Sequence, residues 1–218
     1  MLIRVDSHIK DKPAGRIRQQ NEKKIMEAAE MEFALHGYKG ASIQDIAQRA
    51  GIPKANVHYY FGSKLELYAA VLSNILELWD STLSELKAED DPAEALPSYI
   101  RAKMELSRQY PLASRIFGIE VMNGAEHLKD YFQHEYVEWF NSRTAVFKAW
   151  MQQGKMDEMD PAHLMFLLWS STQHYADFAS QIRAALGKGE MELDQQDFAI
   201  ATETLTRIVL KGCGIQSR

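Results

Sequence analysis

Polar, basic and aromatic side chains gather between residues 42 and 64 of the sequence. Asparagine can pair bidentately with adenine, lysine reaches guanine or phosphate, and hydroxyl and imidazole groups add further hydrogen bonds. We therefore treat this set, with one small alanine among its members, as candidate DNA contacts: Ser42, Lys54, Ala55, Asn56, His58, Tyr59, Tyr60 and Lys64. The alternative is an aromatic-rich helical hairpin that holds Tyr59 and Tyr60 in its core.

A second group of side chains suits a small organic ligand. Aromatic walls with a few polar groups are typical of small-molecule sites, and this pattern predicts ligand contacts at Trp79, Phe117, Trp169, Gln173 and Asp177. Trp169, Gln173 and Asp177 follow at i, i+4 and i+8, so they share one line on a helix. A glutamine amide donates and accepts hydrogen bonds, which suits a cyclic imide or amide. The alternative is an aromatic core with satisfied polar groups, or a dimer face.

The first group lies on a pattern that predicts a helix, a tight turn and a second helix. Ser42 is a good N-cap, and the apolar residues that follow it recur at helical spacing. Gly51 can take the positive φ that such a turn needs, and Pro53 suits the opening of the next helix. This is the helix-turn-helix plan, in which the second helix enters the DNA major groove.

The rest of the chain also has helical periodicity, and strand signals are almost absent. The helices become long after Gly62, which indicates bundle packing. The sequence thus predicts an all-α protein, with an N-terminal three-helix helix-turn-helix domain and a C-terminal antiparallel helical bundle. We expect helices at about 20–36, 43–50, 54–60, 63–87, 93–109, 111–123, 126–152, 161–186 and 195–211.

Charge is distributed unevenly over the 218 residues, whose net charge is −5. Residues 1–70 carry a net charge of +3 and the remainder a net charge of −8. A basic end on an acidic body suggests that one end meets a polyanion. No apolar run reaches the ~18 residues of a membrane span, and no signal peptide is evident, so we expect a cytoplasmic protein.

Motifs of enzymes and metal sites are missing from the sequence. It contains no G-x-S-x-G, P-loop or dinucleotide-binding motif, and the lone Cys213 excludes a disulfide framework and a four-cysteine zinc site. His134 and Glu138 have the i, i+4 spacing of a metal pair, but two ligands rarely make a closed site, and pairing on an exposed helix is the better explanation. We therefore expect no enzyme activity, no metal and no cofactor.

The helix-turn-helix segment resembles the DNA-binding domain of TetR-family repressors over about residues 21–68. The resemblance implies a recognition helix at about Lys54–Tyr60 and a phosphate contact by Lys64. Pro53 departs from the family pattern, in which a Ser or Thr caps this helix. The matching motifs are Phe33-Ala-Leu-His-Gly37-Tyr, Ser42, Ile46-Ala47, Ala50-Gly51 and Tyr59-Tyr60-Phe61-Gly-Ser63-Lys64-Leu-Glu-Leu67.

Two later blocks, residues 99–117 and 160–179, resemble the ligand domain of the RutR-type, pyrimidine-utilisation branch of that family. This resemblance implies a response to uracil, thymine or a related catabolite. It also implies that Trp79 and Trp169 stack on the ligand ring and that Gln173 pairs with its imide. Residues 90–98 and 187–194 match poorly, so a related base or a β-amino acid stays open.

These inferences predict three regions: a basic flexible arm at 1–20, a DNA-binding domain at 21–67, and a ligand-binding and dimerisation domain at 68–212. The arm would bind DNA, or it is a solubilising tail. We expect a homodimer through helices near 161–186 and 195–211 that binds a near-palindromic operator under the control of a small effector. The alternative function is an all-helical interaction protein that does not bind DNA.

Overall fold

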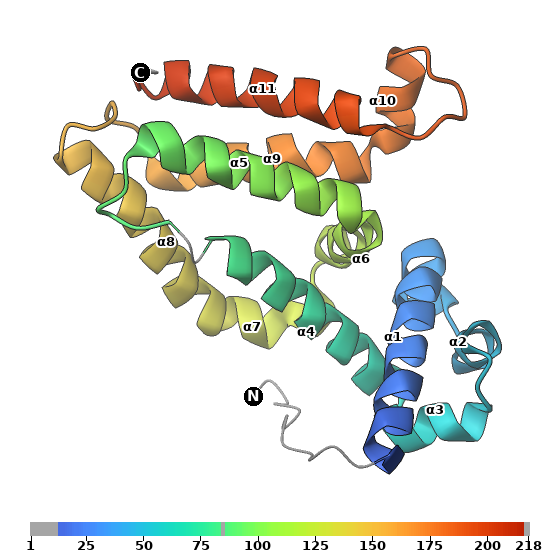
Figure 1. Cartoon of the computed structure of the whole chain (residues 1–218). Helices are drawn as coiled ribbons and strands as arrows, with labels where there is room; N and C mark the ends of the chain where they lie inside the picture. The colour runs from blue at the N-terminus through green and yellow to red at the C-terminus, as the bar shows by residue number, and fades with distance from the viewer. Residues whose placement is uncertain (1–12, 84–85, 216–218) are drawn as a thin grey trace. The chain divides into compact units, whose positions relative to one another are not determined.

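The computed structural model describes residues 13–83 and 86–215 (Figure 1). Regular structure in these two ranges is helical throughout, which confirms the predicted all-α class. The elements are α1 Pro13–Gly40, α2 Ile43–Ala50, α3 Lys54–Phe61, α4 Lys64–Leu83, α5 Pro92–Gln109, α6 Pro111–Met122, the 3₁₀ turn η1 Glu126–Leu128, α7 Lys129–Gln133, α8 Glu135–Gln152, α9 Pro161–Asp177, α10 Ala179–Ala185 and α11 Gln195–Gly212. Among the described residues, no helix is long and apolar enough to cross a membrane.

Helix α1 begins earlier than the sequence predicts. Residues 13–20, which we expected in the flexible arm, belong to this helix, and residues 1–12 lie outside the described residues. Pro13 suits the first turn of a helix, and Arg18 donates to Glu22 one turn later at 2.8 Å. The break expected from Gly37 is a kink within the helix, where Gly37 takes a φ of 65° that favours glycine.

The chain forms two compact units: Met1–Glu77 with Arg115–Asp130, and Leu78–Ser114 with Tyr131–Arg218. Most of α6 therefore belongs to the same compact unit as the helix-turn-helix, although α6 comes much later in the sequence. A boundary after residue 67 does not coincide with this division, and the three predicted regions stay a prediction.

In the first unit, α1 packs against α2 and α2 packs against α3. Apolar side chains from these helices and α4 form its core, including Ile25, Phe33, Ile46, Val57 and Leu67. Two polar contacts fix the helices: Arg49 pairs with the buried Glu32 at 2.7 Å, and the Asn21 amide donates to the Tyr60 hydroxyl at 3.1 Å. The orientation of α3 therefore depends on α1.

In the second unit, α5 packs against both α9 and α11, and α8 packs against α9 (Figure 1). Large side chains fill the space between them, including Leu96, Ile100, Met104, Phe147, Trp150, Met165 and Leu168. The indole of Trp150 donates to the carbonyl of Lys87 at 3.1 Å, so even this buried tryptophan has its polar atom satisfied.

Two long helices predicted from periodicity are broken in the structure. The expected helix 126–152 is divided into η1, α7 and α8, with His134 in a non-helical conformation. The expected helix 161–186 is divided at Phe178 into α9 and α10. Neither break contains the glycine or proline that signals a helix end in a sequence, so periodicity alone could not place them.

Candidate DNA-binding surface and ligand site

The turn between α2 and α3 is built by local interactions that the sequence predicts. The Ser42 hydroxyl accepts from the backbone N–H of Asp45 at 3.1 Å and so caps α2. Gly51 adopts left-handed geometry, with φ 65° and ψ 33°, and its N–H closes the helix onto Ala47 and Gln48. Pro53 precedes α3 without any side-chain cap, as the departure from the family pattern predicts.

Helix α3 turns one residue inward and most of its polar residues outward. Val57 is buried, whereas Lys54, Asn56, His58 and Tyr59 are exposed. Ala55, which could also pack inward on helical spacing, is exposed as well. The Tyr59 side chain is 76% exposed, so it does not belong to a core as the helical-hairpin alternative requires.

Besides Ser42, three of the predicted DNA contacts have partners within the chain. Tyr60 is half-buried and accepts the hydrogen bond from Asn21. The His58 ring lies 2.9 Å from the Gly62 carbonyl, a distance at which Nδ1–H donates. The Lys64 ammonium donates to the carbonyls of Tyr38 and Ala41 at 2.8 and 3.0 Å. An ammonium has three N–H donors, so Lys64 keeps one for a phosphate.

The second unit contains a row of polar contacts between α5 and α9, which we call the α5–α9 seam. It consists of Tyr99, Lys103 and Ser107 on α5 with Trp169, Thr172, Gln173 and Asp177 on α9. The Trp169 indole donates to the Tyr99 hydroxyl at 3.0 Å, and the Ser107 hydroxyl donates to the Thr172 carbonyl at 2.9 Å. At its end, the Ser114 hydroxyl donates to the Asp177 carboxylate at 2.6 Å.

Lys103 lies between the paired residues Tyr99 and Ser107, one turn from each. Its residue is 4% exposed, and its ammonium lies 5.2 Å from the ring centre of Trp79. Burial lowers the pKa of Lys103 to about 8, against the opposing effect of the Asp177 carboxylate. The sequence reasoning missed this residue. Its i+4 spacing from Tyr99 on a face of buried residues was the available signal.

The predicted ligand residues are only partly brought together. Trp169 and Asp177 lie in the seam, and the Trp79 ring lies beside the Lys103 ammonium of the seam. The Trp169 ring is also stacked on Trp139 at 6.1 Å between centres. Gln173 is half-buried on the same helix. Phe117 belongs to the first compact unit together with the helix-turn-helix.

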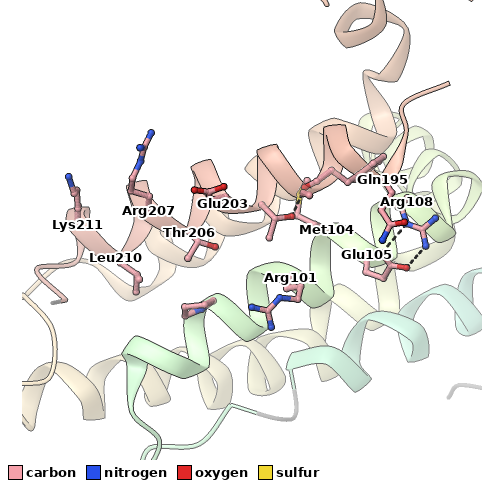
Figure 2. A pocket seen from close by; sticks show the side chains of 14 residues that line it. Arg101, Met104, Glu105, Arg108, Gln195, Glu203, Thr206, Arg207, Leu210 and Lys211 are labelled. Carbon is pink, nitrogen blue, oxygen red and sulfur yellow. Dashed lines mark hydrogen bonds and ion pairs between the residues drawn. The ribbon is translucent and has the colours of Figure 1, made fainter. Parts of the chain in front are cut away.

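A separate groove of about 630 Å³ lies between α5 and α11 (Figure 2). Apolar side chains such as Met104, Phe198 and Leu210 line it together with charged groups. None of the predicted ligand residues borders this groove. Arg207 and Lys211 point away from α5, and Arg108 is paired with Glu105 (Figure 2). The basic groups of this groove therefore do not converge on one point.

No group of three or more His, Cys, Asp and Glu side chains that could hold a metal occurs within residues 13–83 and 86–215. Cys213 is buried, and burial raises the pKa of its thiol to about 11. A thiol with such a pKa is almost fully protonated at neutral pH and is a poor nucleophile.

Known proteins match the chain over both halves. The family profile "Bacterial regulatory proteins, tetR family" matches residues 25–71, and the profile "YcdC-like protein, C-terminal region" matches residues 72–216. The HTH-type transcriptional regulator RutR of Escherichia coli (strain K12) is 40% identical over 190 residues, which is 87% of this chain and 89% of that protein.

More distant proteins have the same organisation. The HTH-type transcriptional repressor SCO4008 of Streptomyces coelicolor is 28% identical over 183 residues, covering 83% of this chain and 91% of that protein. The TetR family transcriptional regulator PfmR of Thermus thermophilus superposes with a TM-score of 0.64 at 23% identity, covering 86% of this chain and 97% of the other. The last likeness concerns the fold alone.

Proposed function

Since the chain belongs to the TetR family of DNA-binding transcriptional regulators and is similar to RutR, we propose that it is a cytoplasmic homodimeric repressor whose effector is a pyrimidine. Regulators of this family are not enzymes, and they bind operator DNA and small effectors, generally as dimers. The observation that carries the proposal is that α3 keeps its polar face exposed while Val57 anchors it.

In this proposal α3 enters the major groove of the operator. Asn56 and Lys54 read base edges, and Tyr59 and His58 add contacts to bases or phosphates. Ser42 and Tyr60 set the position of the two helices. The Tyr60 hydroxyl accepts from Asn21 and keeps its hydrogen for a phosphate, whereas the Ser42 hydroxyl donates its hydrogen to the Asp45 carboxylate. The role of the basic arm predicted at residues 1–20, a DNA contact or a solubilising tail, stays a prediction.

One recognition helix reads only a few base pairs, so specificity requires two copies about one turn of DNA (~34 Å) or more apart. The surfaces that support a dimer are the exposed apolar residues of the last helices, among them Leu167 on α9 and Ile200 and Ile208 on α11. Phe198 and Val209, which lie on the same helix α11, are buried in the core of their own protomer.

The pyrimidine effector rests on the resemblance of residues 99–117 and 160–179 to the pyrimidine-utilisation branch. In this proposal the ligand ring lies at the α5–α9 seam, against Trp79 and Trp169, and Gln173 pairs with the imide. The Ser114–Asp177 contact borders the same region. Ligand binding shifts the equilibrium toward a form that does not bind DNA, with a typical coupling of ~1–3 kcal/mol.

Thermal unfolding of the purified protein with uracil, thymine, their dihydro forms and β-alanine tests the effector. A ligand that binds only the folded state raises the midpoint in proportion to the logarithm of its concentration. We expect uracil or thymine to raise the midpoint, and Gln173→Ala to abolish this shift and leave operator binding intact. Gln152→Ala, which changes an exposed glutamine on α8, is the control. If Gln173→Ala keeps the full shift, the ligand lies elsewhere.

A further inference from the structure

Helix α1 extends beyond the segment that the family profile matches. The profile begins at residue 25, whereas α1 begins at Pro13, so about three turns of helix precede the matched region. These first turns lie beside the C-terminal end of α3 (Figure 1), where the Asn21 amide donates to the Tyr60 hydroxyl at 3.1 Å. Residues 13–24 carry four lysines and arginines against one acid. The extension therefore adds positive charge next to the helix that we place in the major groove.

Arg18 is a cation of this extension that faces α3. It precedes Asn21 by three residues, a spacing that places both side chains on the same face of a helix. The hydrogen bond to Glu22 raises the pKa of Arg18, and the phenol groups of Tyr59 and Tyr60 act electrostatically in the same direction, so they lie near the guanidinium. The Arg18 side chain is 50% exposed. It therefore lies at the border between α1 and the exposed face of α3.

The Arg18 guanidinium keeps donors for a phosphate. It has five N–H donors in a planar fork, and the bond to Glu22 uses the one on Nε, at 2.8 Å. The two terminal nitrogens retain the geometry that binds a phosphate bidentately. The ion pair with Glu22 is exposed to solvent and therefore weak, so a phosphate can compete with the Glu22 carboxylate for Arg18.

We propose that Arg18 is a phosphate contact at the edge of the half-site, and that Glu22 holds the guanidinium in place until DNA binds. This inference rests on the proposed function, because it requires α3 in the major groove. Phosphates border that groove on both sides, so a cation at the end of the recognition helix meets the DNA backbone. The Tyr60 hydroxyl, held by Asn21, donates to the same stretch of backbone. The first turns of α1 thereby lengthen the DNA contact beyond the segment that the family profile matches.

Fluorescence anisotropy of the full-length protein with a labelled operator, selected from random DNA, tests this contact over a range of salt concentrations. Arg18→Gln should weaken binding by about tenfold at low salt and lower the slope of log affinity against log salt by about one for each Arg18 that contacts a phosphate. Arg18→Lys keeps the charge and should keep the slope. Lys23→Gln is the matched control, because Lys23 forms an exposed i, i+4 pair with Glu27 and lies about 200° around the helix from Asn21, away from α3.

Glu22→Gln separates a direct contact from the effect of net charge. In the wild-type background it releases the guanidinium and should tighten DNA binding, and in the Arg18→Gln background its effect should be much smaller. An equal gain in both backgrounds would overturn the role of Glu22 in holding Arg18.

Thermal unfolding checks that each variant is folded, and Arg18→Met takes the place of Arg18→Gln if the latter is not. Unchanged affinity and slope on loss of Arg18, with operator binding intact, would overturn the inference and leave the proposed function standing. An equal loss in Lys23→Gln would also overturn it, because net charge would then explain the effect. A wild-type protein that binds no duplex would contradict the proposed function itself.

Discussion

The contacts that form the caps and turn of the helix-turn-helix join residues close together in the sequence, whereas those of the α5–α9 seam join residues far apart. Ser42 caps α2 through Asp45, three residues later, and Gly51 closes its helix onto Ala47. In the seam, the Ser107 hydroxyl and the Thr172 carbonyl are 65 positions apart. Caps and turns have local sequence signatures, whereas contacts between distant helices are set by packing, so the two regions differ in what a sequence can predict.

They also differ in how their functional side chains are exposed. Lys54, Asn56 and Tyr59 project from α3 into solvent, where substitution changes little but the surface itself. Lys103 and Tyr99 are buried between helices, so we expect their substitution to change stability. Variants on the exposed face of α3 should therefore affect DNA affinity alone, and variants in the seam should affect stability and the response to ligand. The following predictions test this distinction.

The largest effect is expected where the DNA-binding surface meets its core. Val57→Asp buries a charge beneath α3 and should lower the free energy of unfolding by about 3 kcal/mol or more, with loss of operator binding. Ala55→Asp, on the exposed face two residues earlier, should weaken operator binding through charge repulsion and leave stability within about 0.5 kcal/mol of wild type. Chemical denaturation measures both. An unchanged stability in Val57→Asp would show that α3 does not depend on this anchor.

In the seam, the buried charge predicts a dependence of stability on pH. Lys103 loses its proton at about pH 8 in the folded protein and near 10.5 when unfolded, so the unfolded state binds more protons between these values. The free energy of unfolding should therefore rise with pH from about 8 toward 10.5, by up to about 3 kcal/mol, relative to Lys103→Met. Below pH 8 the difference between the two proteins should be constant. Parallel stability curves above pH 8 would contradict the effect of burial on the pKa of Lys103.

A smaller effect is expected from the hydrogen bond between Tyr99 and Trp169. Tyr99→Phe leaves the Trp169 indole N–H without its acceptor in a buried place and should cost about 1–2 kcal/mol of stability. Tyr175→Phe removes a hydroxyl from the same helix pair at a half-buried position and should cost less than about 0.5 kcal/mol. Equal denaturation midpoints for the two variants would mean that the hydrogen bond between Trp169 and Tyr99 makes no net contribution to stability.

The smallest effect concerns DNA affinity. Lys64→Ala should weaken binding to all DNA sequences alike and lower the slope of log affinity against log salt by about 1. Lys148→Ala, which removes an exposed cation on α8, is the control and should keep the slope. Fluorescence anisotropy over a range of salt concentrations gives both slopes. An unchanged slope in Lys64→Ala would show that the Lys64 ammonium binds only the carbonyls of Tyr38 and Ala41 and does not contact a phosphate.

Individual residues show which features of the structure the sequence predicts and which it does not. The N-cap at Ser42 and the glycine turn at Gly51 follow from local rules, and the structure has both. The helix breaks at His134 and Phe178 lack proline and glycine, so only tertiary packing reveals them. Lys103 is buried, whereas lysine side chains are usually exposed. Its residue type therefore does not predict its position in the core.

The central proposal is that a pyrimidine bound in the second unit controls DNA binding by the first. An operator selected from random DNA, labelled with a fluorophore and bound by the wild-type protein, allows a direct titration with uracil and thymine. We expect anisotropy to fall to the value of free DNA as the ligand saturates the protein, and we expect the Gln173→Ala variant to stay bound to DNA. If the complex persists at ligand concentrations that saturate the protein by calorimetry, the claim is contradicted.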